Sequence, residues 1–225
     1  MLGARDTSMT AIAIQNGTYD DDLHIYRDLS GKYVPSITQV LKFTGLSSYS
    51  AAISKEVMEN ASKRGTIVHQ AAWAFAKYGD VDPSWLTDET EPYFAAYRKF
   101  LYETGFQPDP EFVESPMIAC VHGMAFGCTP DVLGSRGKFP HVVELKTVSV
   151  IQRAWRFQTA AQELARFNTK QCGRAVRMAV QLLKNGKYKI DKHEQHQYDC
   201  HVFISALSVV HDRLANGEKL WCAES

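Results

Sequence analysis

The first half of the chain carries its apolar residues mostly at helical spacing, three or four positions apart. Ser36 has the character of a helix N-cap and Gly45 that of a helix stop, so a short helix is predicted between them. Gly105 and two prolines after it are predicted to end the last helix of this half. The elements expected are a hairpin over 23–34 that turns at Ser30-Gly31, and helices over 36–43, 50–77 with a break at Arg64-Gly65, and 87–103.

The pattern becomes strand-like from position 112 onward. Asn185-Gly186, between two apolar runs, is the strongest hairpin signal in the chain. The elements expected are strands over 112–120, 124–133 and 142–147 with turns at His122-Gly123 and 135–138, a helix over 150–167, strands over 173–183 and 187–190, and a helix over 194–215 capped by Asn216-Gly217. This order predicts an α/β fold in which a small mixed β-sheet is flanked by helices, with a further helical layer from the N-terminal part.

The domain organisation expected from these elements is simple. The first 20 residues form a loosely ordered leader, and 21–225 form a single domain. Within that domain, 21–110 are mostly helical and 111–225 form the α/β core.

The charge of the chain is balanced overall but uneven along its length. The 225 residues have a net charge of zero, which is not typical of a simple nucleic-acid coating protein. Residues 131–190 hold twelve Lys or Arg against three acids, a net charge of +9, whereas 79–115 hold nine acids against two bases, a net charge of −7. The basic segment can face a polyanion. Equally, the two segments can be solvated faces that neutralise each other.

The five cysteines include no Cys-x-x-Cys pair, and their number is odd. This argues against a disulfide scaffold and against a close-spaced zinc or iron–sulfur site, and it favours a reducing compartment. The N-terminus lacks the continuous apolar stretch of a signal peptide, and no apolar run approaches the roughly 20 residues that span a bilayer. A soluble, cytoplasmic protein without a membrane partner is expected.

The residues that carry chemistry lie in two neighbouring strands. Asp131 is placed at the end of one strand, and Glu144 and Lys146 lie two positions apart in the next. Side chains alternate along a strand, so Glu144 and Lys146 are predicted to share a face. The connection between the strands is short, so they are expected to pair and to bring Asp131 beside Glu144.

Buried carboxylates need a compensating charge. A hard divalent cation, Mg²⁺ or Mn²⁺, takes carboxylate and backbone carbonyl oxygens, and the carbonyl of Leu145 is a candidate extra ligand. Lys146 can then position a water or stabilise charge in a transition state. The alternative is an ion-pair network of the acids with Lys146 that holds no metal.

Asp131 with Glu144-Leu145-Lys146 resembles the PD-(D/E)XK nuclease superfamily. Three further segments are similar to its RecB-like branch, which includes phage-type exonucleases. They are the Gly-x-x-x-His pattern of Gly65 to His69, the segment 35–41, and Gln158 with the strand pair 177–188. The ordered set covers roughly 33–215. The resemblance implies a restriction-endonuclease-like core.

The resemblance also implies roles for single residues. His69 would be a metal ligand beside Asp131, Glu144 and the Leu145 carbonyl, and its alternative is a satisfied core histidine beside Trp73. Gln158 would orient the ligand strand or touch the DNA backbone, and its alternative is a polar residue on the buried face of a helix. Gly65 lies one turn before His69, where a missing side chain leaves room for the sheet or the metal.

Two positions depart from the family pattern. The tyrosine expected after Gln158 is Gln162 here. The glycine expected three residues before Asp131 is Cys128, with Gly127 one place earlier. Either a small bulge absorbs this shift or the strand differs slightly from that of the family. The cysteine pattern of the iron–sulfur relatives is missing from the sequence, so no cluster is predicted.

The function expected from these features is that of a Mg²⁺- or Mn²⁺-dependent DNA exonuclease in phage or prophage recombination or end processing. Its partner, beside DNA, would be a recombination or single-strand annealing protein. Four arginines of the basic segment are expected to contact DNA phosphates: Arg153, Arg156, Arg174 and Arg177. The alternatives are a structure-specific or restriction-like endonuclease, a nuclease-fold module that binds DNA or protein without cleaving it, and a metal-free α/β binding domain.

Overall fold

The computed structural model describes residues 11–47, 55–148 and 150–218, which form a mixed α/β structure. Its central sheet has the strand order β11-β10-β9-β8-β5. Four neighbouring pairs hold it together, and only β9 and β10 run parallel, so the sheet is mixed as predicted. The strands are β5 (Gln107–Val113), β8 (Val132–Arg136), β9 (Phe139–Lys146), β10 (Val176–Leu182) and β11 (Tyr188–Lys192).

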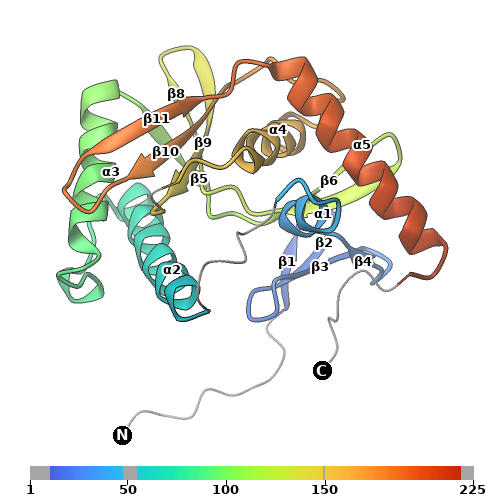
Figure 1. The fold of residues 1–225 in the computed structure, drawn as a ribbon, viewed down its shortest axis with the longest axis horizontal. Helices are drawn as coiled ribbons and strands as arrows, with labels where there is room; N and C mark the ends of the chain where they lie inside the picture. The colour runs from blue at the N-terminus through green and yellow to red at the C-terminus, as the bar shows by residue number, and fades with distance from the viewer. Residues whose placement is uncertain (1–10, 48–54, 149, 219–225) are drawn as a thin grey trace, which may run out of the picture.

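Helices cover both faces of this sheet (Figure 1). On one face lie α2 (Lys55–Tyr78) and α3 (Glu91–Thr104), which pack on alternate residues of β9 and β10 such as Val143 and Val180. On the other lies α4 (Ala154–Phe167), and α5 (His196–Ala215) packs against α4. This alternation sends Val143 and Leu145 towards α2, and therefore sends Glu144 towards α4.

A smaller sheet precedes the first helix. It is formed by β1 (Ala11–Ile14), β2 (Gly17–Asp20), β3 (Ile25–Asp28) and β4 (Tyr33–Val34), all antiparallel. The β3–β4 hairpin was predicted, but the loosely ordered leader over 1–20 is wrong for 11–20, because β1 and β2 pair with each other there and β2 also pairs with β3. Residues 1–10 lie outside the described part.

The helices begin and end largely where local signals place them. Ser36 caps α1 (Ile37–Phe43) with a complete capping box to Gln39. The predicted break at Arg64-Gly65 is wrong, because α2 runs through both residues as one helix. Its predicted start at position 50 lies outside the described residues. A short 3-10 turn, η1 (Pro83–Trp85), precedes α3. Among the residues described, no helix is long and apolar enough to cross a membrane.

The strands before the site differ from the prediction at two points. Residues 112–120 are not one strand: β5 ends at Val113, and β6 (Met117–Val121) begins a separate hairpin with β7 (Met124–Cys128). The prolines in β5 stop the helix but do not prevent a strand, because β5 lies at the sheet edge, where a missing N–H costs little. Residues 124–133 also divide, at Thr129-Pro130, so Asp131 lies just before β8 and not at the end of a strand.

Candidate functional site

Three side chains that can hold a metal ion converge between α2 and the central sheet. His69 comes from α2, Glu114 follows β5, and Asp131 precedes β8. Their ligand atoms all lie within 4.8 Å of one another. The Nδ1 atom of His69 is 2.8 Å from Glu114 Oε1 and 3.5 Å from Asp131 Oδ1. The structure thus brings together two predicted ligands, His69 and Asp131, and adds Glu114.

Glu114 was missed because 112–120 were interpreted as one strand, which placed this acid in its middle. Its backbone has a φ of 48°, a left-handed conformation that is costly for a side chain with a Cβ. The Glu114 N–H donates to the carbonyls of Pro130 and Asp131, at 3.0 and 3.2 Å. These bonds hold the turn and fix Glu114 beside Asp131. The break Glu114-Ser115-Pro116 is the sequence signal that could have found it.

Asp131 is fixed to the neighbouring strand through its side chain. The ladder between β8 and β9 begins at Val132 and Val143, which leaves Asp131 just beyond its end. Its Oδ2 accepts a hydrogen bond from the Leu145 N–H at 2.7 Å. In a strand, the N–H and C=O of one residue point to the same edge. The Leu145 carbonyl therefore points to the Asp131 side of β9, and its role as a metal ligand stays a prediction.

Tyr26 and Gly127 position the segment that leads to Asp131. The Tyr26 hydroxyl hydrogen-bonds Thr129 Oγ1 at 2.6 Å, and the Tyr26 ring lies on Gly127, where an added Cβ would come within 2.2 Å of it. Only glycine fits there. No bulge absorbs the one-residue shift of this glycine: β6 and β7 pair in regular register through Gly127 and Cys128.

Glu144 lies on the α4 side of β9, outside the three-residue group. As predicted, Glu144 and Lys146 share a face, and Lys146 Nζ donates to Glu144 Oε1. The other carboxylate oxygen accepts from Gln162 Nε2 at 2.7 Å. Gln162 therefore makes the contact to the ligand strand that was expected of Gln158. Gln158, one turn earlier, makes no hydrogen bond within the described part of the chain, and it faces the cleft.

The site is buried, and its carboxylates outnumber its positively charged side chains. Burial raises the pKa of Asp131 above its usual range, against the charges of His69 and Lys146. Burial and the charge of Asp131 likewise raise the pKa of Glu144. Burial alone would lower the pKa of His69, but Asp131 and Glu114 outweigh it and raise the pKa to about 9. The shift of His69 reports that positive charge is favourable here, and those of Asp131 and Glu144 report that burial penalises their negative charge.

A cleft of about 1010 Å³ lies beside the metal-ligand cluster, and His69 and Glu114 are the members of the cluster that line it. Its walls come from the small N-terminal sheet, α1, α2 and α4, and Glu114, His69, Gln158 and Gln162 line it. No Lys or Arg belongs to the lining formed by the described residues. Gln162 Oε1 is buried and has no hydrogen-bond partner there, so a buried acceptor remains unsatisfied at the cleft wall.

Gly65 also lines the cleft, but the room it leaves is not essential to the fold. A Cβ at this position would lie 3.8 Å from Thr147 Oγ1, an ordinary contact. The sheet therefore does not require this space for a side chain as small as alanine, and the expected room for a metal stays a prediction.

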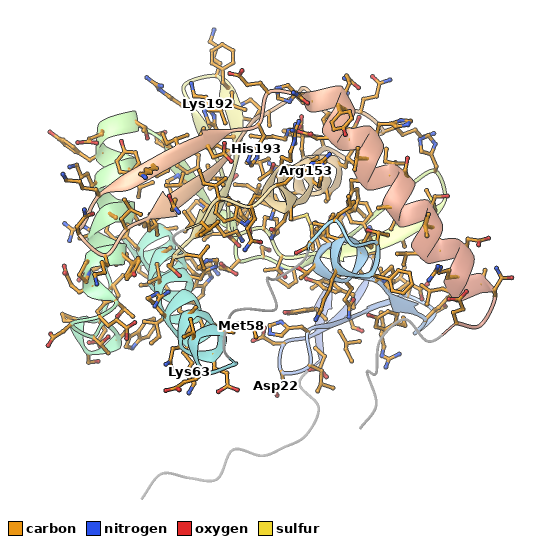
Figure 2. The ribbon with its side chains drawn as sticks, in the orientation of Figure 1. Asp22, Met58, Lys63, Arg153, Lys192 and His193 are labelled. Atoms are coloured by element: carbon orange, nitrogen blue, oxygen red, sulfur yellow. The ribbon has the colours of Figure 1, made fainter. Side chains whose placement is uncertain are left out.

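The four arginines expected to contact DNA lie in different environments. Arg153 and Arg174 are exposed, and Figure 2 shows Arg153 at the start of α4. Arg156 is half-buried and bonds Asp199 and Gln195. The prediction is wrong for Arg177, which is 1% exposed and ion-paired to Glu163 at 3.2 Å and Asp199 at 2.8 Å. Its guanidinium is buried and paired with carboxylates inside the protein, so it cannot contact a DNA phosphate.

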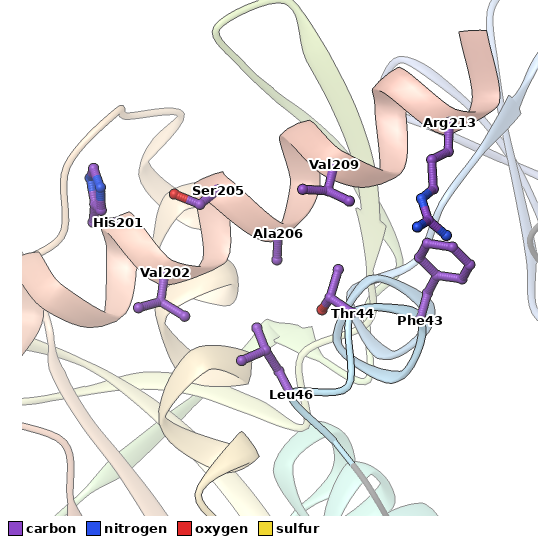
Figure 3. Close-up of a pocket in the computed structure, with 9 residues that line it drawn as sticks. All are labelled: Phe43, Thr44, Leu46, His201, Val202, Ser205, Ala206, Val209 and Arg213. Carbon is purple, nitrogen blue, oxygen red and sulfur yellow. The ribbon is translucent and has the colours of Figure 1, made fainter. Parts of the chain in front are cut away.

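Another pocket, of about 480 Å³, lies between the end of α1 and α5 (Figure 3). Leu46 faces Val202 and Ala206 across it, Phe43 lies against Arg213, and among the described lining residues only His201 and Arg213 are ionisable. No carboxylate is among these lining residues, so the pocket does not resemble a metal site.

Comparisons with known proteins add nothing to this geometry. No family model matches the chain, and no curated protein matches it closely enough to count as a relative.

Proposed function

We propose that this protein is a divalent-metal-dependent nuclease that hydrolyses phosphodiester bonds in DNA. The observation that carries the proposal is the convergence of His69, Glu114 and Asp131 beside a cleft that His69 and Glu114 line, with Glu144 and Lys146 on the adjoining strand.

The residues present fit a hard divalent cation. Three carboxylates lie close to one lysine and one histidine, and burial penalises the charge of Asp131 and Glu144. Oxygen donors suit Mg²⁺ and Mn²⁺, and the imidazole of His69 favours Mn²⁺. Four groups would hold the ion: His69, Glu114, Asp131 and the Leu145 carbonyl. Glu144 would become a further ligand by giving up its hydrogen bond to Lys146 or to Gln162. When bound, the ion would lower the pKa of a water and neutralise charge on a phosphate.

The chain's own groups would complete the chemistry. Lys146, held against Glu144, has donors and no lone pair, so it acts on the attacking water or on the developing phosphate charge rather than as a ligand. Gln162 keeps Glu144 in orientation through its amide. The restriction-endonuclease-like core and the exonuclease activity are parts of the same proposal, and both rest on the ordered motifs that resemble the RecB-like branch.

The DNA backbone is expected to reach the cleft over exposed cations outside it. Because no Lys or Arg is among the described residues that line the cleft, the metal would supply most of the positive charge there, and Arg153 and Arg174 would supply phosphate contacts beyond it. Affinity measured with Ca²⁺ in place of Mg²⁺ should fall steeply with salt, and less steeply in an Arg153→Ala/Arg174→Ala double variant. If the affinity of the two proteins for DNA falls equally steeply with salt, these arginines do not contact the DNA backbone.

The direct test is an assay of the pure protein on end-labelled linear DNA with Mg²⁺, Mn²⁺ or EDTA. We expect release of labelled nucleotides with either ion, a lower working concentration for Mn²⁺, and none with EDTA. A covalently closed DNA circle has no ends and should resist an exonuclease. Cleavage of the circle would therefore show that the protein is an endonuclease. DNA that stays intact under every metal condition would refute the nuclease and leave a binding module.

A further inference from the structure

A groove of about 730 Å³ lies at the opposite end of the central sheet from the metal-ligand cluster. It is lined by the start of β9 and β10, the end of β11 and the end of α3. Phe139, at the start of β9, is five residues from Glu144, or about 16 Å at the usual rise of a strand. In Figure 2, Lys192 of this groove lies on the opposite side of the molecule from Asp22, whose chain neighbours Asp21 and Leu23 line the cleft.

The groove exists because α3 ends before the sheet does. The sheet face covered by α2 and α3 continues in register from Val143 and Met178 to Lys192 of β11. Beyond Thr104, the last residue of α3, no helix of the described chain covers this face. Three large apolar side chains are therefore exposed there: Phe139 at 69%, Ile190 at 38% and Val176 at 36%. A cluster of this kind is typical of an interaction surface.

The rim of the groove is cationic. Arg136, Lys138 and Lys192 line it, and no acid is among its lining residues. None of the three forms an ion pair within the described part of the chain. The groove therefore fits a bulky apolar side chain that is surrounded by carboxylates.

The chain itself offers such a segment. Residues 79–91 hold five acids and no Lys or Arg, and in their middle Trp85 is 47% exposed. This segment precedes α3, whereas the groove lies beyond the other end of α3, a helix of 14 residues and so about 21 Å long. The Trp85 of one molecule therefore cannot reach the groove of the same molecule, so a contact between the two would join two copies of the chain.

We infer that this groove binds the acidic Trp85 segment of a second copy of the chain. Trp85 would lie on Ile190 and Phe139, and acids such as Asp82 and Asp88 would meet Lys138 and Lys192. The two surfaces differ, so the contact is head-to-tail and can continue into a ring or a filament. The inference does not depend on the proposed nuclease activity, because neither surface touches the cleft.

Sedimentation velocity over a range of protein concentrations, without DNA or metal, tests it. The wild-type protein should self-associate, and added salt should weaken the association. Trp85→Ala and Ile190→Asp should each be monomers. Tyr102→Ala is the matched control, since this aromatic residue is 91% exposed on α3 but belongs to neither surface, and it should associate like the wild type.

Mixing the two monomeric variants gives the sharpest outcome. Ile190→Asp keeps an intact Trp85, and Trp85→Ala keeps an intact groove, so the mixture should form a heterodimer and nothing larger. If Ile190→Asp does not fold, Lys192→Glu takes its place. A wild type that stays monomeric, a Trp85→Ala variant that associates normally, or a mixture that stays monomeric overturns the inference.

Discussion

Two clusters of charged side chains lie inside this protein, and they meet α4 at neighbouring residues. Gln162 reaches Glu144 in the cluster at the cleft, whereas Glu163 belongs to a second cluster with Arg177, Asp199 and Arg156. The second cluster is balanced, two arginines against two carboxylates. Glu163 Oε1 also accepts three backbone N–H bonds, from 173, 174 and 175, at 2.6 to 2.9 Å.

The cluster at the cleft has the opposite character. Its carboxylates exceed its cations, burial raises the pKa of Asp131, and burial together with the charge of Asp131 raises the pKa of Glu144. A cleft opens onto it, whereas none of the four residues of the second cluster lines that cleft. The difference teaches that burial of charge alone does not mark a site. A functional site is marked by buried charges that are only partly compensated and that lie next to an open cleft.

The largest effect is expected in the balanced cluster. Arg177→Met leaves Glu163 and Asp199 without their shared cation, and breaking a buried pair in this way costs about 3–5 kcal/mol. Urea unfolding measures the loss. Arg174→Met, an exposed arginine three residues away, should change the free energy of unfolding by no more than about 0.5 kcal/mol. Equal stabilities of the two variants would show that the second cluster is not structural.

The cleft cluster should respond in binding rather than in folding. Glu114→Gln keeps the side chain's shape but removes a ligand charge, so Mn²⁺ affinity should fall by at least the roughly 10- to 100-fold that loss of an outer-shell partner costs. Calorimetry measures it. Glu111→Gln, an exposed acid of β5, is the control and should bind Mn²⁺ as the wild type does. Unchanged affinity in Glu114→Gln would exclude Glu114 as a ligand.

A smaller effect is expected at Gln162. Gln162→Leu removes the bond to Glu144 and leaves a buried carboxylate oxygen without this donor, so the free energy of unfolding should fall by about 1–3 kcal/mol and metal affinity about 10-fold. The variant Gln158→Leu, one helical turn earlier, distinguishes the roles of the two glutamines. A larger loss of cleavage in Gln158→Leu than in Gln162→Leu would return the orienting role to Gln158, as the family resemblance implies.

How far the sequence predicted this structure depends on the range of the interactions. The Ser36 capping box, the Asn185-Gly186 hairpin and the pairing that brings Asp131 to β9 are local, and they were predictable. For Glu114, the break at Ser115-Pro116 signals the end of the strand, but its place beside Asp131 was not predictable, because it depends on bonds to Pro130 and Asp131 across the fold. The burial of Arg177 was not predictable either, since its partners come from two different helices, α4 and α5.

The measurement that tests the central claim most directly is a pair of readouts on Lys146→Met. Lys146 contacts Glu144 but is not a ligand, so the variant should fold and bind Mn²⁺ at least as tightly as the wild type, because a nearby positive charge is gone. Cleavage of end-labelled DNA should fall by on the order of 10²-fold or more, the usual cost of one preorganised electrostatic group. A variant that cuts at nearly the wild-type rate, or one that unfolds early as Arg177→Met should, would contradict the assignment.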